Sequence, residues 1–310
     1  MSSTSPRVWL ITGANSGLGL ALAECVLSQG DHVIAAVRKV SSIPESIKDA
    51  KPLVLNLNAS DSEIKQAGSE ALKIYGGGRH FFRPPPYGRV DVLVNNAGYC
   101  LTGYTEELDD ADIKREFQTN FFGAISLTQS LLPAFRQQKS GHILNLSSVA
   151  AMAGGAPFAM YNASKAALEA ATESLSLELA PFNIRVLIIE PGYFPTNFLA
   201  TAGANGTHPT RSTGAYPDWS TVPDGYAARH VASKQVGDLN KAAARMFEVV
   251  SGTGLAEEFV ASGRREFVRP DCGTRLRAKV KLLAENVEAT EKIWSSTDMD
   301  EDKFTKFAQQ

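Results

Sequence analysis

The chain has 310 residues, of which 44% are hydrophobic and 21% are charged, and its formal net charge at pH 7 is −2. These values are typical of a globular protein with a sizeable core, and so small a charge gives no long-range attraction to nucleic acid or an anionic membrane. Three widely separated cysteines argue against a disulfide framework or a zinc site, and neither a secretory signal nor an apolar run of roughly 20 residues is present. We therefore expect a cytoplasmic protein with no metal, no nucleic-acid partner and no membrane anchor.

Short β-branched runs alternate with longer helical patterns over the first two thirds of the chain, which is typical of βαβ units and a parallel sheet. Most runs are continuously apolar, as strands buried on both faces are. The expected strands are Val8–Ile11, His32–Val37, Leu53–Leu57, Asp91–Val94, His142–Leu146 and Arg185–Ile189. The expected helices are Leu18–Ser28, Ser62–Ile74, Asp112–Phe135, Ala159–Ala180 and Leu239–Val250. The pattern predicts an α/β fold: a doubly wound parallel sheet with helices on both faces.

Two segments interrupt this alternation. Gly76–Gly88 contains three consecutive glycines and three consecutive prolines, which neither continue a helix nor join a central strand. We expect it at the amino end of the sheet, away from any site. Ala200–Gly225 is rich in Gly, Thr, Pro and Ser but carries aromatics, so we expect a substrate lid over about residues 197–226. Residues 1–263 are expected to form one catalytic domain, with a strand and helical extension, residues 264–310, packed on it.

A glycine-rich turn follows the first expected strand. Glycines let the backbone turn sharply and approach a pyrophosphate, whose charge then meets the exposed amides of a helix N-terminus. The spacing is Gly-x3-Gly-x-Gly, and the competing interpretation is a tight strand-to-helix turn without a ligand. Its position between the first strand and the first helix favours dinucleotide binding. The candidate residues are Gly13, Asn15, Ser16, Gly17, Leu18 and Gly19.

The second expected strand ends in Val37-Arg38-Lys39. An acidic residue at this turn would hold the ribose hydroxyls of NAD(H), whereas a cation suits the 2′-phosphate of NADP(H). Arg38 offers a planar fork that binds phosphate through two hydrogen bonds. Alternatively, Arg38 and Lys39 are only solvated loop charges. Together with the missing acid they favour NADP(H).

Tyr161 and Lys165 are four residues apart in a helical pattern, which places them on one face, one turn apart. A phenol is a poor proton-transfer group at neutral pH, and a nearby ammonium favours phenolate and lowers its pKa. Taken alone, such a pair would be a half-buried tyrosine beside a surface lysine. Here Ser147 and Ser148 end the fifth strand on the side where doubly wound sheets bind ligands, and Asn95-Asn96-Ala97-Gly98 ends the fourth.

The order of these motifs, with Asn120 between them and Pro191-Gly192 to Thr196 after the sixth strand, resembles the short-chain dehydrogenase/reductase family over residues 7–198. The resemblance is to its ordinary, NADP-preferring branch, and it implies a Rossmann-type fold. It also implies a catalytic tetrad of Asn120, Ser148, Tyr161 and Lys165. Ser148 is preferred to Ser147 because it lies 13 residues before the tyrosine, the usual family spacing.

The same resemblance implies further cofactor contacts. Lys165 would bind the nicotinamide ribose, Asn120 would position a relay water, and Thr196 would bind the carboxamide. The remaining positions are Asn56, Leu57, Asn96, Ala97, Gly98, Pro191, Gly192 and Phe194. Asn56 departs from the family, which usually has an aspartate near the adenine there, and we expect weaker cofactor binding at most. The C-terminal sequence resembles tails of microbial and fungal reductases of this type.

The function that follows is an NADP(H)-dependent oxidoreductase that interconverts a ketone or aldehyde and an alcohol. Two alternatives stay open: a catalytically silent NADPH-binding regulatory protein, and an epimerase or dehydratase on the same scaffold. Aromatic and apolar residues near the site suggest a hydrophobic, aromatic or polycyclic small-molecule substrate. They equally suit core closure or a subunit contact; they are Tyr99, Met152, Phe158, Tyr193 and Phe194. In the family, helices at Asp112–Phe135 and Ala159–Ala180 form the dimer contact, which implies a homodimer or homotetramer.

Overall fold

The computed structural model describes residues 5–75, 88–198, 212–217, 235, 237–262 and 273–294. The chain divides into two units, Met1–Cys272 and Gly273–Gln310. The second unit contains one described helix, α11 (Gly273–Trp294). We expected the extension to begin at residue 264, and its packing on the first unit stays a prediction.

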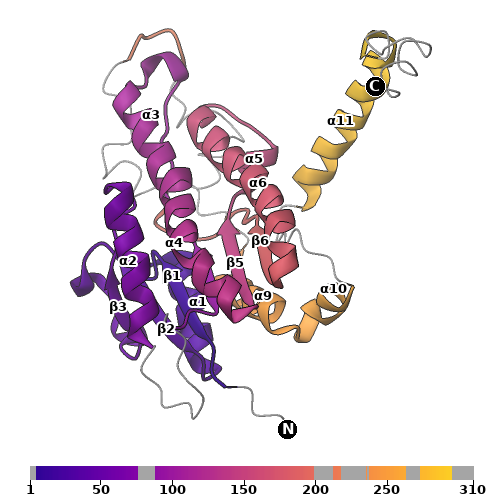
Figure 1. The fold of residues 1–310 in the computed structure, drawn as a ribbon. Helices are drawn as coiled ribbons and strands as arrows, with labels where there is room; N and C mark the ends of the chain where they lie inside the picture. The colour runs from indigo at the N-terminus through magenta and orange to yellow at the C-terminus, as the bar shows by residue number, and fades with distance from the viewer. Residues whose placement is uncertain are drawn as a thin grey trace, which may run out of the picture. The chain divides into compact units, whose positions relative to one another are not determined.

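A six-stranded parallel sheet forms the centre of the first unit, in the order β3-β2-β1-β4-β5-β6 (Figure 1). Because the strand order reverses between β1 and β4, a crevice opens there at the carboxyl ends of the strands, where open α/β sheets bind ligands. The predicted doubly wound sheet is confirmed. Its strands are β1 (Val8–Thr12), β2 (His32–Val37), β3 (Lys51–Val54), β4 (Val92–Asn95), β5 (Gly141–Leu146) and β6 (Ile184–Ile189).

Helices cover both faces of the sheet, and successive side chains of each strand point to opposite faces. Trp9 and Ile11 of β1 pack with α1 (Gly17–Ser28) and α9 (Leu239–Ser251). Leu10 lies between them in β1 and points to the opposite face of the sheet. There it packs in a second hydrophobic core, to which three helices contribute. These are α2 (Asp61–Ile74), α4 (Gly123–Gln138) and α6 (Ala159–Leu179).

Shorter helices connect these layers. The α-helical ones are α3 (Asp110–Phe117), α5 (Val149–Met152) and α10 (Glu257–Ala261). Single 3₁₀ turns are η1 (Val40–Ser42), η2 (Glu45–Ile47), η3 (Thr105–Glu107), η5 (Ala180–Phe182) and η7 (Gly254–Ala256). Asp109 is the N-cap residue of α3.

The single helix expected over Asp112–Phe135 is wrong. The structure has α3, then a five-residue π-helical turn, η4 (Gln118–Phe122), and then α4. Gly123 follows this turn and packs closely on the loop after β3, since a methyl group there would lie 2.9 Å from Leu57 O. The π-helical turn carries Asn120, whose side chain it directs into the protein, and such turns are frequent at functional sites.

The strand expected over Leu53–Leu57 begins and ends earlier. The observed β3 starts at Lys51, and after Val54 the chain turns at Asn56, whose Oδ1 accepts a hydrogen bond from Asn58 N at 3.1 Å. The ladder with β2 ends in a last bond from Leu55 N to Val37 O. Asn56 and the residues after it therefore lie at the carboxyl end of the sheet.

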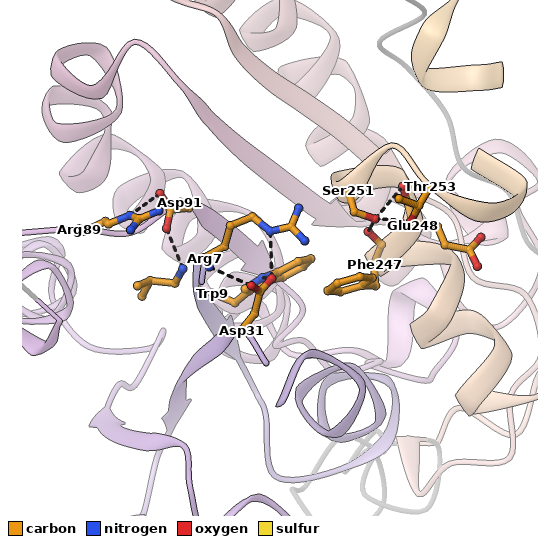
Figure 2. Close-up of polar contacts among 10 residues, drawn as sticks. Arg7, Trp9, Asp31, Arg89, Asp91, Phe247, Glu248, Ser251 and Thr253 are labelled. Atoms are coloured by element: carbon orange, nitrogen blue, oxygen red, sulfur yellow. Dashed lines mark hydrogen bonds and ion pairs between the residues drawn. The ribbon is translucent and has the colours of Figure 1, made fainter. Parts of the chain in front are cut away.

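Polar contacts fix the start of β1 at the opposite, amino end of the sheet (Figure 2). Asp31 accepts hydrogen bonds from Arg7 N, Arg7 Nε and Trp9 Nε1 at 2.9 to 3.0 Å. Asp91 accepts from Val8 N at 2.7 Å and from Arg89 Nε at 2.9 Å. These two carboxylates, each just before a strand, hold β1, β2 and β4 in register.

Both irregular segments fall largely outside the described residues. Of Gly76–Gly88 only Gly88 is described, and of the expected lid only residues 197, 198 and 212–217 are. Within this short piece, Tyr216 stacks on Tyr104 with ring centres 4.2 Å apart, and Glu107 accepts two hydrogen bonds from Thr213. None of the helices in the described ranges is long and apolar enough to span a membrane, and those ranges contain no cluster of three or more potential metal ligands.

Candidate active site

A cleft of about 820 Å³ lies at the carboxyl ends of the strands. It runs from the glycine-rich turn after β1 to the first turn of α6 and to the segment after β6. Nearly all the residues predicted for the site line it. These are Gly13, Asn15, Ser16, Gly17, Leu18, Arg38, Lys39, Asn56, Leu57, Asn96, Ala97, Gly98, Ser148, Tyr161, Lys165, Pro191, Gly192, Phe194 and Thr196.

Two residues of the glycine-rich turn take a left-handed backbone conformation that residues with a side chain rarely adopt. Gly13 and Gly17 have φ of +66° and +55°, which glycine adopts without strain. Gly19 has a different role, because it does not line the cleft: a methyl group there would lie 2.4 Å from Asn96 Nδ2 and 2.5 Å from Gly13 O. Gly19 therefore lets α1 approach the neighbouring loop closely.

Thr12 and Asn96 fasten that loop to the glycine-rich turn. Thr12 Oγ1 accepts hydrogen bonds from Asn96 N at 3.0 Å and Ala97 N at 2.9 Å. The amide of Asn96 in turn donates to Thr12 O at 2.8 Å. Two loops that are more than 80 residues apart in the chain thus share one hydrogen-bond network. The turn is held open toward the cleft before any ligand binds, which reduces the ordering cost of binding.

Cations dominate the charge of the cleft. Arg38 and Lys39 follow β2 directly, and Arg115 and Lys165 are the other cationic residues among those that line it. Over the part of the chain that the structure describes, no Asp or Glu side chain lines this cleft. The site therefore suits a ligand with several negative charges, such as a dinucleotide phosphate.

Lys165 is almost completely buried, with 4% of its surface exposed. Its Nζ donates a 2.7 Å hydrogen bond to Leu146 O, the last carbonyl of β5. Burial lowers the pKa of Lys165 to about 8, although the buried carboxylates Glu116 and Glu169 favour its charged form. An ammonium is thus fixed at the floor of the cleft, with a pKa well below that of an exposed lysine.

Tyr161 lies one turn before Lys165 on α6 and also lines the cleft. Only 5% of its surface is exposed. Its ring packs with Cys100, Ala150 and Phe158, and its centre is 5.8 Å from that of the Phe198 ring. The helix and this apolar packing hold the Tyr161 ring at the wall of the cleft. The sequence prediction that the phenol and the ammonium share a helical face at the cleft agrees with this placement.

The two serines after β5 differ in their partners. Ser147 Oγ donates to Glu169 Oε1 at 2.5 Å and is directed toward α6. Ser148 is the N-cap residue of α5, and its Oγ accepts a hydrogen bond from Ala150 N at 3.2 Å. A hydroxyl that accepts through one lone pair can still donate its own hydrogen. The structure therefore favours Ser148 as the serine that meets a substrate oxygen.

Asn120 lies behind the cleft wall and is 1% exposed. Its Oδ1 accepts from Tyr99 N at 3.1 Å, and its Nδ2 donates to Tyr99 O at 2.9 Å and to Ser164 Oγ at 3.1 Å. A methyl group at Gly98 would lie 2.9 Å from Asn120 Oδ1. Its side chain thus supports the Gly98–Tyr99 backbone, and the relay water remains a prediction.

Some expected neighbours of the substrate lie elsewhere. Phe158 is 5% exposed and packs against Tyr161 and Cys100, so it closes the small core beneath the site. Met152, at the end of α5, does not line the cleft either. Tyr99, Tyr193 and Phe194 do line it, with Phe198 beside them. The apolar wall is therefore built from the loops after β4 and β6.

Several residues of the site were not predicted. Thr12 is not among the predicted residues, although its place just before the first glycine of the turn is a usable signal. Glu116 and Glu169 are buried carboxylates beside Lys165, and each lies four residues from a predicted tetrad member on the helical pattern. Spacing alone would have made them candidates, but helical carboxylates are usually exposed, so their burial gave no sequence signal.

The arrangement fits a nicotinamide dinucleotide. The positive-φ glycines and the start of α1 can accept a pyrophosphate, and the cationic rim can hold further phosphate. At the other end of the cleft, a phenol, a hydroxyl and a buried ammonium converge. Such groups can donate a proton to an oxygen and stabilise charge that develops on it.

Comparison with known proteins supports this interpretation. A family profile described as short chain dehydrogenase matches residues 7–206. Oxidoreductase claN of Passalora fulva is 40% identical over 194 residues, which cover 61% of this chain and 83% of that protein. Retinol dehydrogenase 8 of Bos taurus is 35% identical over 218 residues, which cover 66% of this chain and 67% of that protein.

A solved structure extends the similarity beyond the matched segment. The crystal structure of a short-chain dehydrogenase from Streptomyces avermitilis has a TM-score of 0.77 and 30% identity, and the match covers 95% of this chain and 100% of that one. The profile covers well over half of the residues. The chain therefore belongs to the short-chain dehydrogenase family of oxidoreductases.

Proposed function

We propose that this protein is an NADP(H)-dependent oxidoreductase that interconverts a carbonyl group and an alcohol on an apolar small molecule. The observation that carries the proposal is the convergence of Ser148, Tyr161 and Lys165 on one cleft whose far end is a glycine-rich turn. Each group has a chemical task in the reaction. All three side chains line the same cleft, into which a substrate oxygen can enter.

In the direction of reduction, Ser148 Oγ donates a hydrogen bond to the substrate carbonyl and Tyr161 gives its proton to the same oxygen. Lys165 favours the phenolate that results, because an ammonium lowers the free energy of a nearby anion. Proton transfer by such a placed group accelerates a reaction by about 10² to 10⁴-fold. The bound nicotinamide cofactor supplies or accepts the hydride. In oxidation, Tyr161 takes the proton from the alcohol.

The choice of NADP(H) rests on the rim of the cleft. Arg38 and Lys39 stand where an acid would bind the ribose hydroxyls in an NAD(H) site. Ser42 lies beside them, where its Oγ donates to Lys39 O at 2.6 Å and accepts from Asn15 Nδ2 at 3.3 Å. The guanidinium group of Arg38, the ammonium of Lys39 and nearby polar side chains suit a 2′-phosphate. The polar side chains are those of Ser42 and Asn15.

The substrate class follows from the apolar wall. Tyr99, Tyr193, Phe194 and Phe198 line the cleft beside the tetrad, and aromatic walls bind apolar or aromatic ligands better than sugars. The similarity to a protein named retinol dehydrogenase, whose named substrate is an apolar alcohol, supports the same choice. The catalytically silent alternative is disfavoured because all four tetrad side chains are present. Epimerisation or dehydration on this scaffold is an outcome that product analysis would reveal.

We also propose that the protein is a homodimer or homotetramer, with α4 and α6 at the contact. Large apolar side chains are exposed next to or on these helices: Phe122 is 52% exposed, Leu177 75% and Phe182 40%. Leu177→Glu should reduce the molar mass measured by light scattering. An unchanged mass would place the contact elsewhere.

The decisive experiment follows the absorbance of NADPH with a panel of aromatic ketones, quinones and aldehydes. Wild type is compared with Tyr161→Phe, which keeps the ring and removes the hydroxyl. We expect wild-type turnover and at least a roughly hundred-fold lower kcat in the variant, with NADPH binding retained. Equal turnover by both proteins would contradict the mechanism. Binding of NADPH without turnover by either would favour the regulatory alternative.

A further inference from the structure

Glu116, at the end of α3, is a fully buried carboxylate with 0% of its surface exposed. Its two oxygens have separate partners: Oε1 accepts from Asn120 Nδ2 at 3.0 Å, and Oε2 accepts from Leu101 N at 2.9 Å. Burial raises the pKa of Glu116 to about 8, whereas the N–H of Leu101, the ammonium of Lys165 and the Asn120 amide oppose this rise and favour the ionised carboxylate. Both hydrogen-bond partners are N–H donors, so the geometry suits the ionised form. Burying an ion costs free energy unless it is paired, so such a group is retained where it orders something else.

The segment that Glu116 orders is the 98–101 loop. Asn120 binds the N–H and the C=O of Tyr99, and Glu116 binds the N–H of Leu101. Two side chains one helical turn apart therefore hold three backbone groups, much as a neighbouring strand would. Gly98 and Tyr99 are the part of this loop that lines the cleft.

Glu116 also orients Asn120 itself. A carboxylate can only accept hydrogen bonds, so it requires the NH₂ end of the Asn120 amide to point toward it. The Oδ1 end then faces Tyr99 N, the contact observed in the structure. The negative charge of an ionised Glu116 also favours the charged form of Lys165 at the floor of the cleft.

We propose that Glu116 is a positioning residue of this active site, which fixes the Tyr99–Leu101 backbone and the Asn120 amide and supports the charge of Lys165. Its role in turnover rests on the proposed function, whereas its role in ordering the loop does not. Besides Tyr161, one turn away on α6, the charged or titratable groups near Glu116 and Lys165 are Tyr99, Cys100, Glu169 and, near Tyr99, Arg115 and Asp112. Of these, Glu169 is the other carboxylate that faces Lys165.

The test uses Glu116→Gln and Glu116→Ala in the full chain. Asp110→Asn is the matched control, because Asp110 is an exposed carboxylate on the same helix. Glu169→Gln removes the other carboxylate beside Lys165 and is a control for charge alone. Amide hydrogen exchange of the 98–102 segment is measured without substrate, and kcat and KM are measured against pH with wild-type substrates.

We expect amide exchange of Leu101 to rise roughly ten- to a hundred-fold in Glu116→Ala, which removes the acceptor, and to stay unchanged in both controls. In Glu116→Gln the rise should be smaller but measurable, because one neutral oxygen must replace two acceptors that bind Leu101 N and Asn120 Nδ2. The alkaline limit of reduction should move to lower pH in Glu116→Gln and Glu169→Gln, but only the Glu116 variants should combine this with faster exchange. Unchanged exchange in Glu116→Gln and Glu116→Ala would overturn the proposal. If Glu116→Ala does not fold, Glu116→Gln, which is similar in size, decides it. Absence of wild-type turnover would contradict the proposed function and leave the exchange result decisive for Glu116.

Discussion

Gly19 and Asn96 pack so closely that a methyl group on residue 19 would lie 2.4 Å from Asn96 Nδ2. The same methyl group would lie 2.5 Å from Gly13 O, a backbone atom of the glycine-rich turn. A real side-chain carbon does not approach these atoms so closely. The first helix can therefore lie where it does only if residue 19 is glycine, and the shape of the phosphate-binding turn depends on that packing.

Gly19→Ala should destabilise the protein and weaken cofactor binding. Overpacking of this kind typically costs about 1 to 3 kcal/mol, and the displaced turn should bind NADPH at least roughly ten-fold more weakly. Thermal unfolding and fluorescence titration with NADPH measure the two effects. Gly155→Ala is the matched control, because a methyl group there has no neighbour within 4 Å. Equal melting temperatures and equal NADPH affinities for Gly19→Ala and Gly155→Ala would show that residue 19 tolerates a side chain.

Arg38→Asp should reverse the cofactor preference. A charge-assisted hydrogen bond to phosphate contributes roughly 1.5 to 3 kcal/mol, so kcat/KM for NADPH should fall about ten-fold or more while that for NADH is kept or rises. Lys114→Asp makes the same change of charge at an exposed residue that does not line the cleft. It should leave the ratio of the two kcat/KM values unchanged. An unchanged ratio in Arg38→Asp would remove the main support for NADP(H).

Lys165→Met should abolish the alkaline pH dependence of reduction together with most of the activity. Burial lowers the pKa of Lys165 to about 8, so the wild-type rate should decline as the pH rises through that value and the ammonium loses its proton. Loss of the ammonium should lower kcat by about 10² to 10⁴-fold. Steady-state kcat measured from neutral to alkaline pH tests both statements. A wild-type profile that stays flat through pH 8 would show that Lys165 does not control the proton transfer.

The fold and much of the site could be predicted because the informative features are local. Val8–Ile11 is continuously apolar since both faces of β1 are covered, and the glycine-rich turn that follows the strand is required by positive φ values. The edge strand β3 was harder to predict than the central strands. Among the strands that the structure describes, β3 lies at the edge and pairs with β2 alone, so it tolerates Lys51 and Pro52, and its composition did not predict a strand start there.

Glu116 shows why the rest could not be predicted. Its partner Leu101 lies 15 residues away, across a loop whose path is set by β4 and by the π-helical turn. In the sequence, Glu116 is one of several charges in Asp110–Phe117 and has the spacing of an ordinary exposed helical carboxylate. Only the tertiary packing next to the π-helical turn η4 distinguishes it.

His142 should make the protein less stable at acidic pH. Burial lowers its pKa to about 4, and the nearby cations Arg185 and Arg7 act in the same direction, so the folded protein holds it neutral. The unfolded chain binds a proton at an ordinary pKa of about 6.5, so the stability that His142 contributes is present above this value and is lost as the pH falls toward 4. The loss between pH 7 and pH 5 is on the order of 2 kcal/mol.

Urea unfolding of wild type and His142→Gln at pH 7 and pH 5 measures this contribution, because every group that the two proteins share cancels in the comparison. His142→Gln should lose about 2 kcal/mol less than wild type between the two pH values. His32 is exposed at the start of β2, and His32→Gln should behave like wild type. If His142→Gln and wild type lose the same free energy of unfolding, His142 is protonated in the folded state, and the amino end of the sheet must accommodate three neighbouring cations.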